Sequence, residues 1–379
     1  MSRVDLKKDF VDFADSVYLN CATQGPLPRV AVAAGRQALD LEARPEQITD
    51  EMYFSVPDGY RAAVAALVQA DSRDVAVTDS TTHGMMLLVN GLDWRSGDEV
   101  LLPVGEFPAN RFPWLSLEKR GVVVREIDLA GGELGAVETL AAAITERTRV
   151  VSLAWVSYRT GERLDVDAIG ELCRDRRVLY AIDASQGVGG LEFDLRRTPC
   201  DLLACSGYKW MLGPYGLGFA WISPEIGERL ALGNINWFAV RGARDFSRLS
   251  ECRFEFEPGA RRFDINETAS FAKLGAGTAS ARYLAGIGVD RAEAHTKALL
   301  DRVLAGLPPR FRALLQPDSS PRSNLLFLTA DSEEMVGAAY RRLGERGVSV
   351  GWREGAIRVS PFVYNDQEDI DRLLEGLAG

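Results

Sequence analysis

Short apolar runs alternate with helical segments through the middle of the chain, and this alternation constrains the fold more strongly than any other feature. Runs rich in Val, Leu and Ile recur between residues 75 and 204, separated by segments with the apolar spacing of helices. This order is typical of βαβ units, which build a mostly parallel sheet covered on both faces. The sequence therefore predicts an α/β fold. The predicted strands are residues 75–78, 99–103, 122–127, 150–154, 178–182 and 202–204, and the predicted helices between them are 85–89, 109–120, 138–145 and 166–174.

Further helices flank this core on both sides. Pro28 suits the first turn of a helix over residues 29–43, and a second helix is expected over residues 57–69. After residue 258 the pattern is that of a smaller α+β domain. We therefore expect a large domain of residues 18–257 and a small domain of residues 1–17 and 258–379. The expected elements after residue 258 are helices 268–284, 289–305, 333–346 and 367–376, and strands 325–328, 348–351 and 356–360.

Composition excludes several classes of function. The formal net charge is −10 and no basic run is present, which argues against nucleic acid or an anionic membrane as a partner. No apolar run is long enough to span a bilayer. An odd number of cysteines (5), no Cys-x-x-Cys pair and a charged start without a signal sequence favour a reducing, cytoplasmic location. With only His83 and His295 present, no histidine-rich metal site is expected.

The stretch from residue 179 to residue 218 carries the strongest chemical signal. Asp183 ends a predicted strand, where ligands of parallel sheets gather, and Lys209 lies in Ser-Gly-Tyr-Lys ahead of a glycine-rich run. A lysine amine can hold an aldehyde cofactor as a Schiff base, and a carboxylate can keep a pyridine nitrogen protonated. A lone lysine is more often solvated, and an aspartate at a strand end is often only a cap. Their combination with Gln186 and Ser206 favours a cofactor site.

Hydroxyl groups also cluster at the start of the first predicted helix of the sheet domain. Ser80, Thr81 and Thr82 precede His83 and Gly84, and the free N–H groups of a helix N-terminus attract anions. The same residues can serve as a helix cap and nothing more. Taken alone, this segment leaves both interpretations open.

The central motifs resemble those of the class V, cysteine desulfurase-like family of fold-type I pyridoxal phosphate enzymes, in the branch with isopenicillin-epimerase-like proteins and carbon–sulfur lyases. That family has Asp-x-x-Gln after a strand, then Ser-x-His-Lys and Gly-Pro-x-Gly-x-Gly. Here the chain reads Asp183-Ala-Ser-Gln186, Ser206-Gly-Tyr-Lys209 and Gly213-Pro-Tyr-Gly-Leu-Gly218, with weaker matches from about Tyr18 to Leu374. The resemblance implies a large, mostly parallel, seven-stranded-type sheet domain, a smaller C-terminal α+β domain and pyridoxal 5′-phosphate as cofactor.

Roles at the cofactor follow from this resemblance position by position. Lys209 would be the Schiff-base lysine and proton carrier, and Asp183 the partner of the pyridinium nitrogen. Gln186 would face the phenolic oxygen, and Ser206 the phosphate. Tyr208 replaces the usual histidine before the lysine, and its hydroxyl can still bind the phosphate with less charge.

Four further segments match the family. Thr81-Thr82-His83-Gly84 resembles its Thr-Thr-Glu-Gly phosphate loop, which favours the anion site. Phe107 stands where a histidine ring stacks on the cofactor, but a phenyl ring cannot transfer a proton. Arg358 resembles the arginine that holds the substrate carboxylate, and Asn20 lies in a loop that lines the substrate side.

The chain also departs from the desulfurase pattern. No cysteine follows Cys252, although a desulfurase keeps its persulfide-forming thiolate in that region. Ordinary cysteine desulfurase activity is therefore not expected. Tyr158 stands where desulfurases carry an asparagine near the cofactor, and residues 257–263 replace a Gly-Thr that reaches a partner subunit's phosphate.

We therefore predict a cytoplasmic homodimer with shared active sites that acts on an amino acid and uses pyridoxal phosphate. Aminotransferase activity ranks first, followed by carbon–sulfur (β-elimination) lyase and then epimerase activity. A non-enzymatic phosphate-binding α/β protein ranks last, because both Lys209 and Asp183 are present. Dimerisation is implied by the resemblance, with Trp237, Arg261 and Arg262 as interface candidates.

Overall fold

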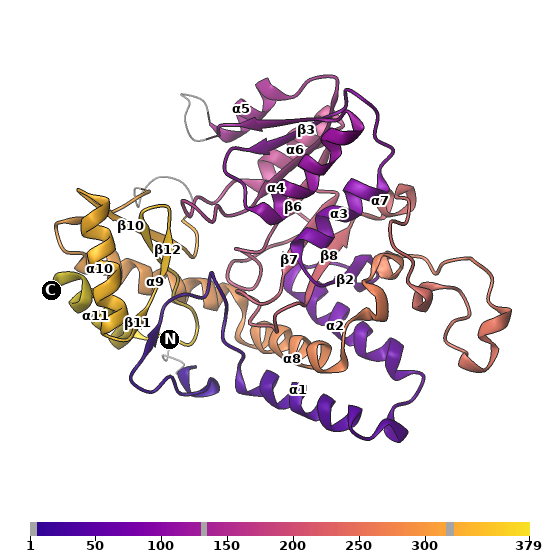
Figure 1. Cartoon of the computed structure of the whole chain (residues 1–379), viewed down its shortest axis with the longest axis horizontal. Helices are drawn as coiled ribbons and strands as arrows, with labels where there is room; N and C mark the ends of the chain where they lie inside the picture. Colours follow the sequence, from indigo (N-terminus) through magenta and orange to yellow (C-terminus); the bar gives the residue numbers. More distant parts are fainter. Residues whose placement is uncertain (1–5, 130–134, 316–321) are drawn as a thin grey trace.

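A seven-stranded sheet forms the centre of the molecule in the computed structural model, which describes residues 6–129, 135–315 and 322–379 (Figure 1). All its strands run parallel except β8, which is antiparallel to both of its neighbours. The predicted α/β fold with a mostly parallel sheet is therefore confirmed. In spatial order the strands are β2 (Val75–Thr78), β8 (Gly218–Ile222), β7 (Leu202–Ser206), β6 (Leu179–Asp183), β5 (Thr148–Ala154), β3 (Glu99–Pro103) and β4 (Val123–Ile127).

Helices cover both faces of this sheet, as the near-continuous apolar strands require. Successive strand residues belong to two different cores: Val151 and Leu153 pack on one face, and Val150 packs on the other. One face is covered by α2 (Met52–Val68), α5 (Ala136–Ala143), α6 (Val166–Arg176) and α8 (Phe271–Ile287); the other by α3 (Thr81–Gly91), α4 (Pro108–Leu115) and α7 (Pro224–Arg229).

One predicted helix starts at the wrong residue, and one strand of the large sheet was not predicted. The helix expected at residue 57 begins five residues earlier, with Pro57 inside α2. Its first turn is held by aromatic packing, since the Tyr53 and Phe54 rings lie 5.9 and 5.5 Å from the Phe238 ring. Strand β8 was not predicted, because the glycine-rich run before it indicates only a loop.

The smaller module lies beside the sheet at the left of Figure 1. Its antiparallel sheet has the order β12-β13-β10-β9, and β1 near the N-terminus pairs in parallel with β11. Strand 348–351 was predicted as one element but divides into β11 and β12. The elements are β1 (Val17–Tyr18), β9 (Phe311–Ala313), β10 (Leu326–Ala330), β11 (Val348–Ser349), β12 (Gly351–Arg353), β13 (Ala356–Val359), α9 (Val289–Gly306), α10 (Glu333–Glu345) and α11 (Gln367–Ala378).

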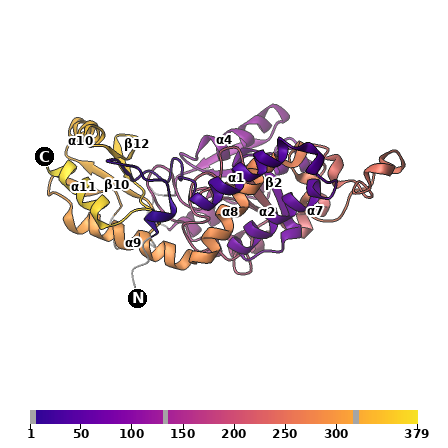
Figure 2. The same ribbon diagram turned by 90° about the horizontal axis from the view of Figure 1, so that it is seen from below.

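The contacts of α8 and of the N-terminal segment favour boundaries between the two modules that differ from the predicted residues 17 and 258. Helix α8 was assigned to the small domain, but it packs along α1 (Arg29–Glu42) and α2, and it lies beside both helices in Figure 2. Residues up to Cys21 bond instead to the small module, through Leu19 N to Ser349 O and Cys21 N to Ser360 O. We therefore propose a boundary at Gly288, between α8 and α9, and a second near residue 21.

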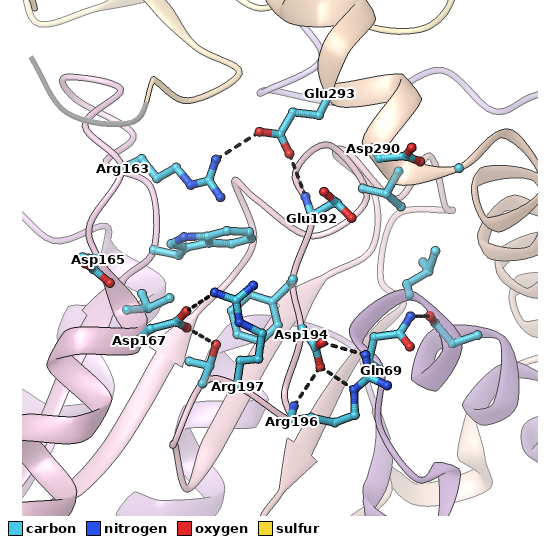
Figure 3. A pocket seen from close by; sticks show the side chains of 18 of the residues that line it. Gln69, Arg163, Asp165, Asp167, Glu192, Asp194, Arg196, Arg197, Asp290 and Glu293 are labelled. Carbon is cyan, nitrogen blue, oxygen red and sulfur yellow. Dashed lines mark hydrogen bonds and ion pairs between the residues drawn. The ribbon is translucent and has the colours of Figure 1, made fainter. Parts of the chain in front are cut away.

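A pocket of about 760 Å³ lies where α9 meets the large module (Figure 3). Each of the three arginines that line it pairs with an acid of the same pocket. Glu293 of α9 accepts hydrogen bonds from Arg163 Nη1 and Glu192 N at 3.1 and 2.9 Å, and Asp194 pairs with Arg196. None of the predicted site residues lines this pocket, and its ion pairs tie α9 to the large module.

In the parts of the chain that the structure describes, no helix combines the length and the apolar character needed to cross a membrane. The same parts contain no group of three or more His, Cys, Asp or Glu side chains arranged to hold a metal ion.

Candidate active site

Lys209 and Asp183 lie at the carboxyl edge of the sheet. Asp183 is the last residue of β6, and Lys209 lies in the loop that joins β7 to β8. This loop closes on itself, because Gly213 N donates to Gly207 O and Gly207 N donates to Leu217 O. The lysine is thus held at a defined point rather than on a free surface.

Both side chains are buried, with 7% of Lys209 and 5% of Asp183 exposed. Burial lowers the pKa of Lys209, and the Asp183 carboxylate opposes that shift. Burial likewise raises the pKa of Asp183, opposed by Lys209 and by the Ser185 N–H that donates to Oδ1 at 2.9 Å. A lowered lysine pKa favours the neutral amine, which is the nucleophilic form.

Three hydroxyl groups meet beside this pair, at the first residue of α3. Thr81 Oγ1 lies 2.5 Å from Ser185 Oγ and 2.9 Å from Ser206 Oγ, and Thr81 N donates to Ser206 Oγ. All three residues are buried. The cluster sits at a helix N-terminus, where N–H groups and the helix dipole favour an anion. Ser185 was missed in the sequence, although it lies between Asp183 and Gln186 in the quoted motif.

Aromatic rings surround the lysine amine. Lys209 Nζ lies 5.3 Å from the centroid of the Phe107 ring and 5.8 Å from that of Tyr208. The Phe107 ring meets the Tyr158 ring edge-to-face, with centroids 5.0 Å apart. The Phe107 ring therefore lies next to the amine, and Tyr158 extends the same wall; stacking of Phe107 on a cofactor stays a prediction.

The N-terminal loop approaches the lysine from the other side. Gly25 N donates to Tyr208 O, and a Cβ at Gly25 would lie 2.1 Å from Lys209 O, so only glycine fits. Two hydrogen bonds also hold the Gln186 side chain in this region: its Nε2 donates to Ala22 O, and its Oε1 accepts from Trp210 Nε1. One amide hydrogen of Gln186 is left for another acceptor.

Arg358 is buried on β13, and its guanidinium faces this loop. Arg358 Nη2 donates to Thr23 Oγ1 at 2.7 Å and to Asn20 Oδ1 at 3.4 Å, and Nε is buried without a hydrogen-bond partner. Burial, together with the charge of Arg353, lowers the pKa of Arg358 to about 10. Thr23 was not predicted; it is exposed, and only its contact with the arginine identifies it.

Two predicted residues lie apart from the cluster. Thr82 and His83 line a separate pocket of about 350 Å³ with Asn90 and Gly233, and Thr81 alone of the predicted loop contacts Ser206. On a helix, residues adjacent in sequence point about 100° apart, so one turn cannot present all three side chains to one group. A phosphate role for Thr82 and His83 stays a prediction that no contact in the described chain supports.

A buried carboxylate, Glu106, supports the wall that carries Phe107. Its Oε1 accepts from Ala154 N at 2.7 Å, and its Oε2 accepts from Asn110 Nδ2 at 3.0 Å. Burial raises the pKa of Glu106 to about 7, opposed by these hydrogen bonds. Because this value exceeds the 4.5 of an exposed glutamate, the stabilisation linked to protonation is complete below pH 4.5 and is lost as the pH rises through about 7.

We expect Glu106→Gln to remove this dependence. Relative to wild type, the free energy of unfolding of the variant should rise by on the order of 3 kcal/mol between pH 4.5 and pH 8. Urea unfolding across this range measures the difference, and the exposed Glu118→Gln serves as the control. If the difference in unfolding free energy between variant and wild type is the same at every pH, the inferred titration of Glu106 is contradicted. A pH-independent contribution from the altered bond to Asn110, added to the expected change with pH, leaves the prediction intact.

Comparison with known proteins assigns this site to a family. Residues 41–373 match the family model described as aminotransferase class-V. The chain belongs to this family. A probable cysteine desulfurase of Methanothermobacter thermautotrophicus is 31% identical over 413 residues, which cover 100% of this chain and 99% of the relative. Isopenicillin N epimerase of Streptomyces clavuligerus is 29% identical, covering 95% of this chain and 94% of the relative.

Solved structures confirm the fold. The cystine C–S lyase C-DES in complex with cysteine persulfide superposes with a TM-score of 0.87 at 24% identity, covering 96% of this chain and 98% of that one. The apo cysteine desulfurase from Thermococcus onnurineus gives a TM-score of 0.85 at 20% identity, with 99% and 98% covered. These likenesses agree with the predicted fold-type I architecture.

Class V enzymes use pyridoxal phosphate, and the donor set of this site fits that group. Lys209 supplies an amine and Asp183 a carboxylate, both buried at the carboxyl edge of the sheet. Thr81, Ser185 and Ser206 supply hydroxyls at a helix N-terminus. Lys209, Asp183 and these hydroxyls are the residues that would hold the cofactor.

Proposed function

We propose that this chain catalyses β-elimination on an amino acid, with Lys209 carrying pyridoxal phosphate and acting as the proton carrier. The observation that carries the proposal is the missing thiol. The last cysteine is Cys252, and Cys21 and Cys205, which lie close to Lys209, are completely or almost completely buried. Burial raises the pKa of both thiols, which disfavours a thiolate. The names of the relatives support chemistry at a C–S bond or at Cα.

The residues of the chain divide the work as follows. Pyridoxal phosphate, held by Lys209, Asp183 and the hydroxyls of Thr81, Ser185 and Ser206, would supply an electron sink for the Cα carbanion. Arg358 offers two N–H directions to the substrate carboxylate, which orients the Cα–H bond toward Lys209. Lys209 Nζ takes the Cα proton, and its lowered pKa provides the neutral amine that this step needs. The Cβ–heteroatom bond breaks, its electron pair leaves with the heteroatom, and hydrolysis of the resulting enamine releases a 2-oxo acid and ammonium.

Transamination, which ranked first in the sequence, is the second candidate, and the description of the matching family model favours it. Purified protein incubated with amino acids that do or do not carry a β-leaving group separates the two. Stoichiometric 2-oxo acid, ammonium and leaving group from the first kind alone supports elimination. Conversion of the cofactor to its amine form by both kinds supports transamination, and loss of optical purity alone supports epimerisation. If no amino acid changes the cofactor absorbance, the proposal is wrong.

A homodimer with shared sites and a cytoplasmic location also stay proposals. Trp237 is 38% exposed and lies beside the Phe238 and Phe246 rings. Sedimentation of wild type and of Trp237→Ala tests both the oligomeric state and this residue.

A further inference from the structure

Two arginines reach the substrate side of the site without a carboxylate partner. In the described parts of the chain, Arg353 and Arg358 form no ion pair, whereas Arg159 of the large module pairs with Glu354 at the tip of the same hairpin. Arg353 Nη2 lies 3.4 Å from Thr23 Oγ1, and Arg358 Nη2 lies 2.7 Å from the same oxygen. Burial has the largest effect in lowering the pKa of Lys209, and the charges of Arg358 and Arg353 act in the same direction.

The strand pairing explains why both guanidiniums lie on one side. Arg353 pairs with Ala356 and Gly351 pairs with Arg358, so these four residues share a face of the β12–β13 hairpin. Trp352 and Ile357 lie on the opposite face and pack into the small module's core. Gly351 leaves the space that the Arg358 guanidinium uses, because a Cβ there would lie 3.1 Å from Arg358 Nε.

The turn that follows Arg353 and an ion pair at its tip also hold Arg353 in place. The two residues after it, Glu354 and Gly355, have φ values of 47° and 78°, as in a tight two-residue hairpin turn. Glu354, the acid adjacent to Arg353, is bound instead to Arg159 of the large module at 2.7 Å. The hairpin tip is therefore anchored across the site, and its acid is not available to neutralise Arg353.

Two unneutralised guanidiniums that meet at one hydroxyl repel each other, and an anion at each would remove that repulsion. One substrate carboxylate accounts for Arg358. We infer that the substrate carries a second anionic group on its leaving side chain, and that Arg353 binds it. The substrate class is thus an amino acid whose β-substituent ends in a carboxylate or a similar acid. This inference rests on the proposed elimination at the same site.

Two isosteric pairs of compounds test the inference. S-carboxymethylcysteine and S-(carbamoylmethyl)cysteine differ only in the distal charge, and we expect kcat/KM to favour the acid by roughly 10- to 100-fold, as for a charge-assisted hydrogen bond. Glutarate and its monoamide, glutaramate, cannot undergo elimination. In calorimetric titrations of the cofactor-loaded protein, glutarate should bind more tightly by a similar factor.

Because the loss of the Arg353 charge also acts on Lys209, the preference is measured as the ratio of acid to amide within each variant. Arg353→Met should bring both ratios close to one, and Arg353→Lys should retain part of them. Arg341→Met, on the exposed side of α10, is the matched control for loss of one positive charge. If Arg353→Met weakens acid and amide equally, both arginines bind one carboxylate and the inference is overturned. Equal binding of glutarate and glutaramate also overturns it. If glutarate is preferred but no compound is eliminated, the proposed reaction fails and the second anion site stands.

Discussion

Replacing Lys209 with alanine is expected to lower turnover by roughly 10⁴-fold or more. Losses of this size are found when the nucleophile of an enzyme is removed. The side chain is the buried amine beside Asp183, and it is the proposed covalent attachment point and proton carrier at once. Borohydride should fix the cofactor to wild type and not to Lys209→Ala. Absorbance after dialysis and peptide mass analysis measure this directly.

Lys119→Ala is the matched control, because Lys119 is an exposed lysine in the short helix Ser116–Arg120 and has no proposed role at the cofactor. It should retain both the activity and the fixed cofactor. Peptide mapping that places the reduced cofactor on a lysine other than Lys209 would disprove the assignment. Circular dichroism of Lys209→Ala distinguishes a lost amine from a lost fold.

Asp183→Asn is expected to reduce turnover by about 10³-fold while the cofactor stays bound, as when a preorganised charge is removed from a transition state. The carboxylate ends β6 and is 5% exposed, so its negative charge is little screened by water. An amide of the same size keeps the packing and the bond from Ser185 N, but it cannot stabilise a protonated ring nitrogen.

Asp183→Glu keeps the charge and should restore part of the activity, whereas Asp201→Asn tests a carboxylate at the other end of the sheet. Asp201 accepts from Tyr180 N at the start of β6 and should affect stability rather than kcat. Turnover of Asp183→Asn within tenfold of wild type would exclude the carboxylate as the ring partner. Loss of bound cofactor would mean that Asp183 acts in binding instead.

The sequence determined the parts of this protein that depend on local pattern. Alternating apolar runs fixed most of the strands and helices, because a strand buried on both faces must be continuously apolar. The motifs around Asp183 and Lys209 predicted the family and the cofactor through their resemblance to class V enzymes, and the family-model match over residues 41–373 confirmed the family. Within a single motif, such as Asp183 to Gln186, residues close in sequence are also close in space.

Tertiary structure decided what depends on contacts between distant segments. Thr81 and Ser206 are 125 residues apart in the chain, and Arg358 and Thr23 are 335 apart, yet each pair shares a hydrogen bond. Packing against Phe238 placed Pro57 inside a helix, against its local preference. Helix geometry separated Thr82 and His83 from Thr81. The second arginine became visible only in the folded hairpin, because a charge without a partner can be recognised only when all its neighbours are known.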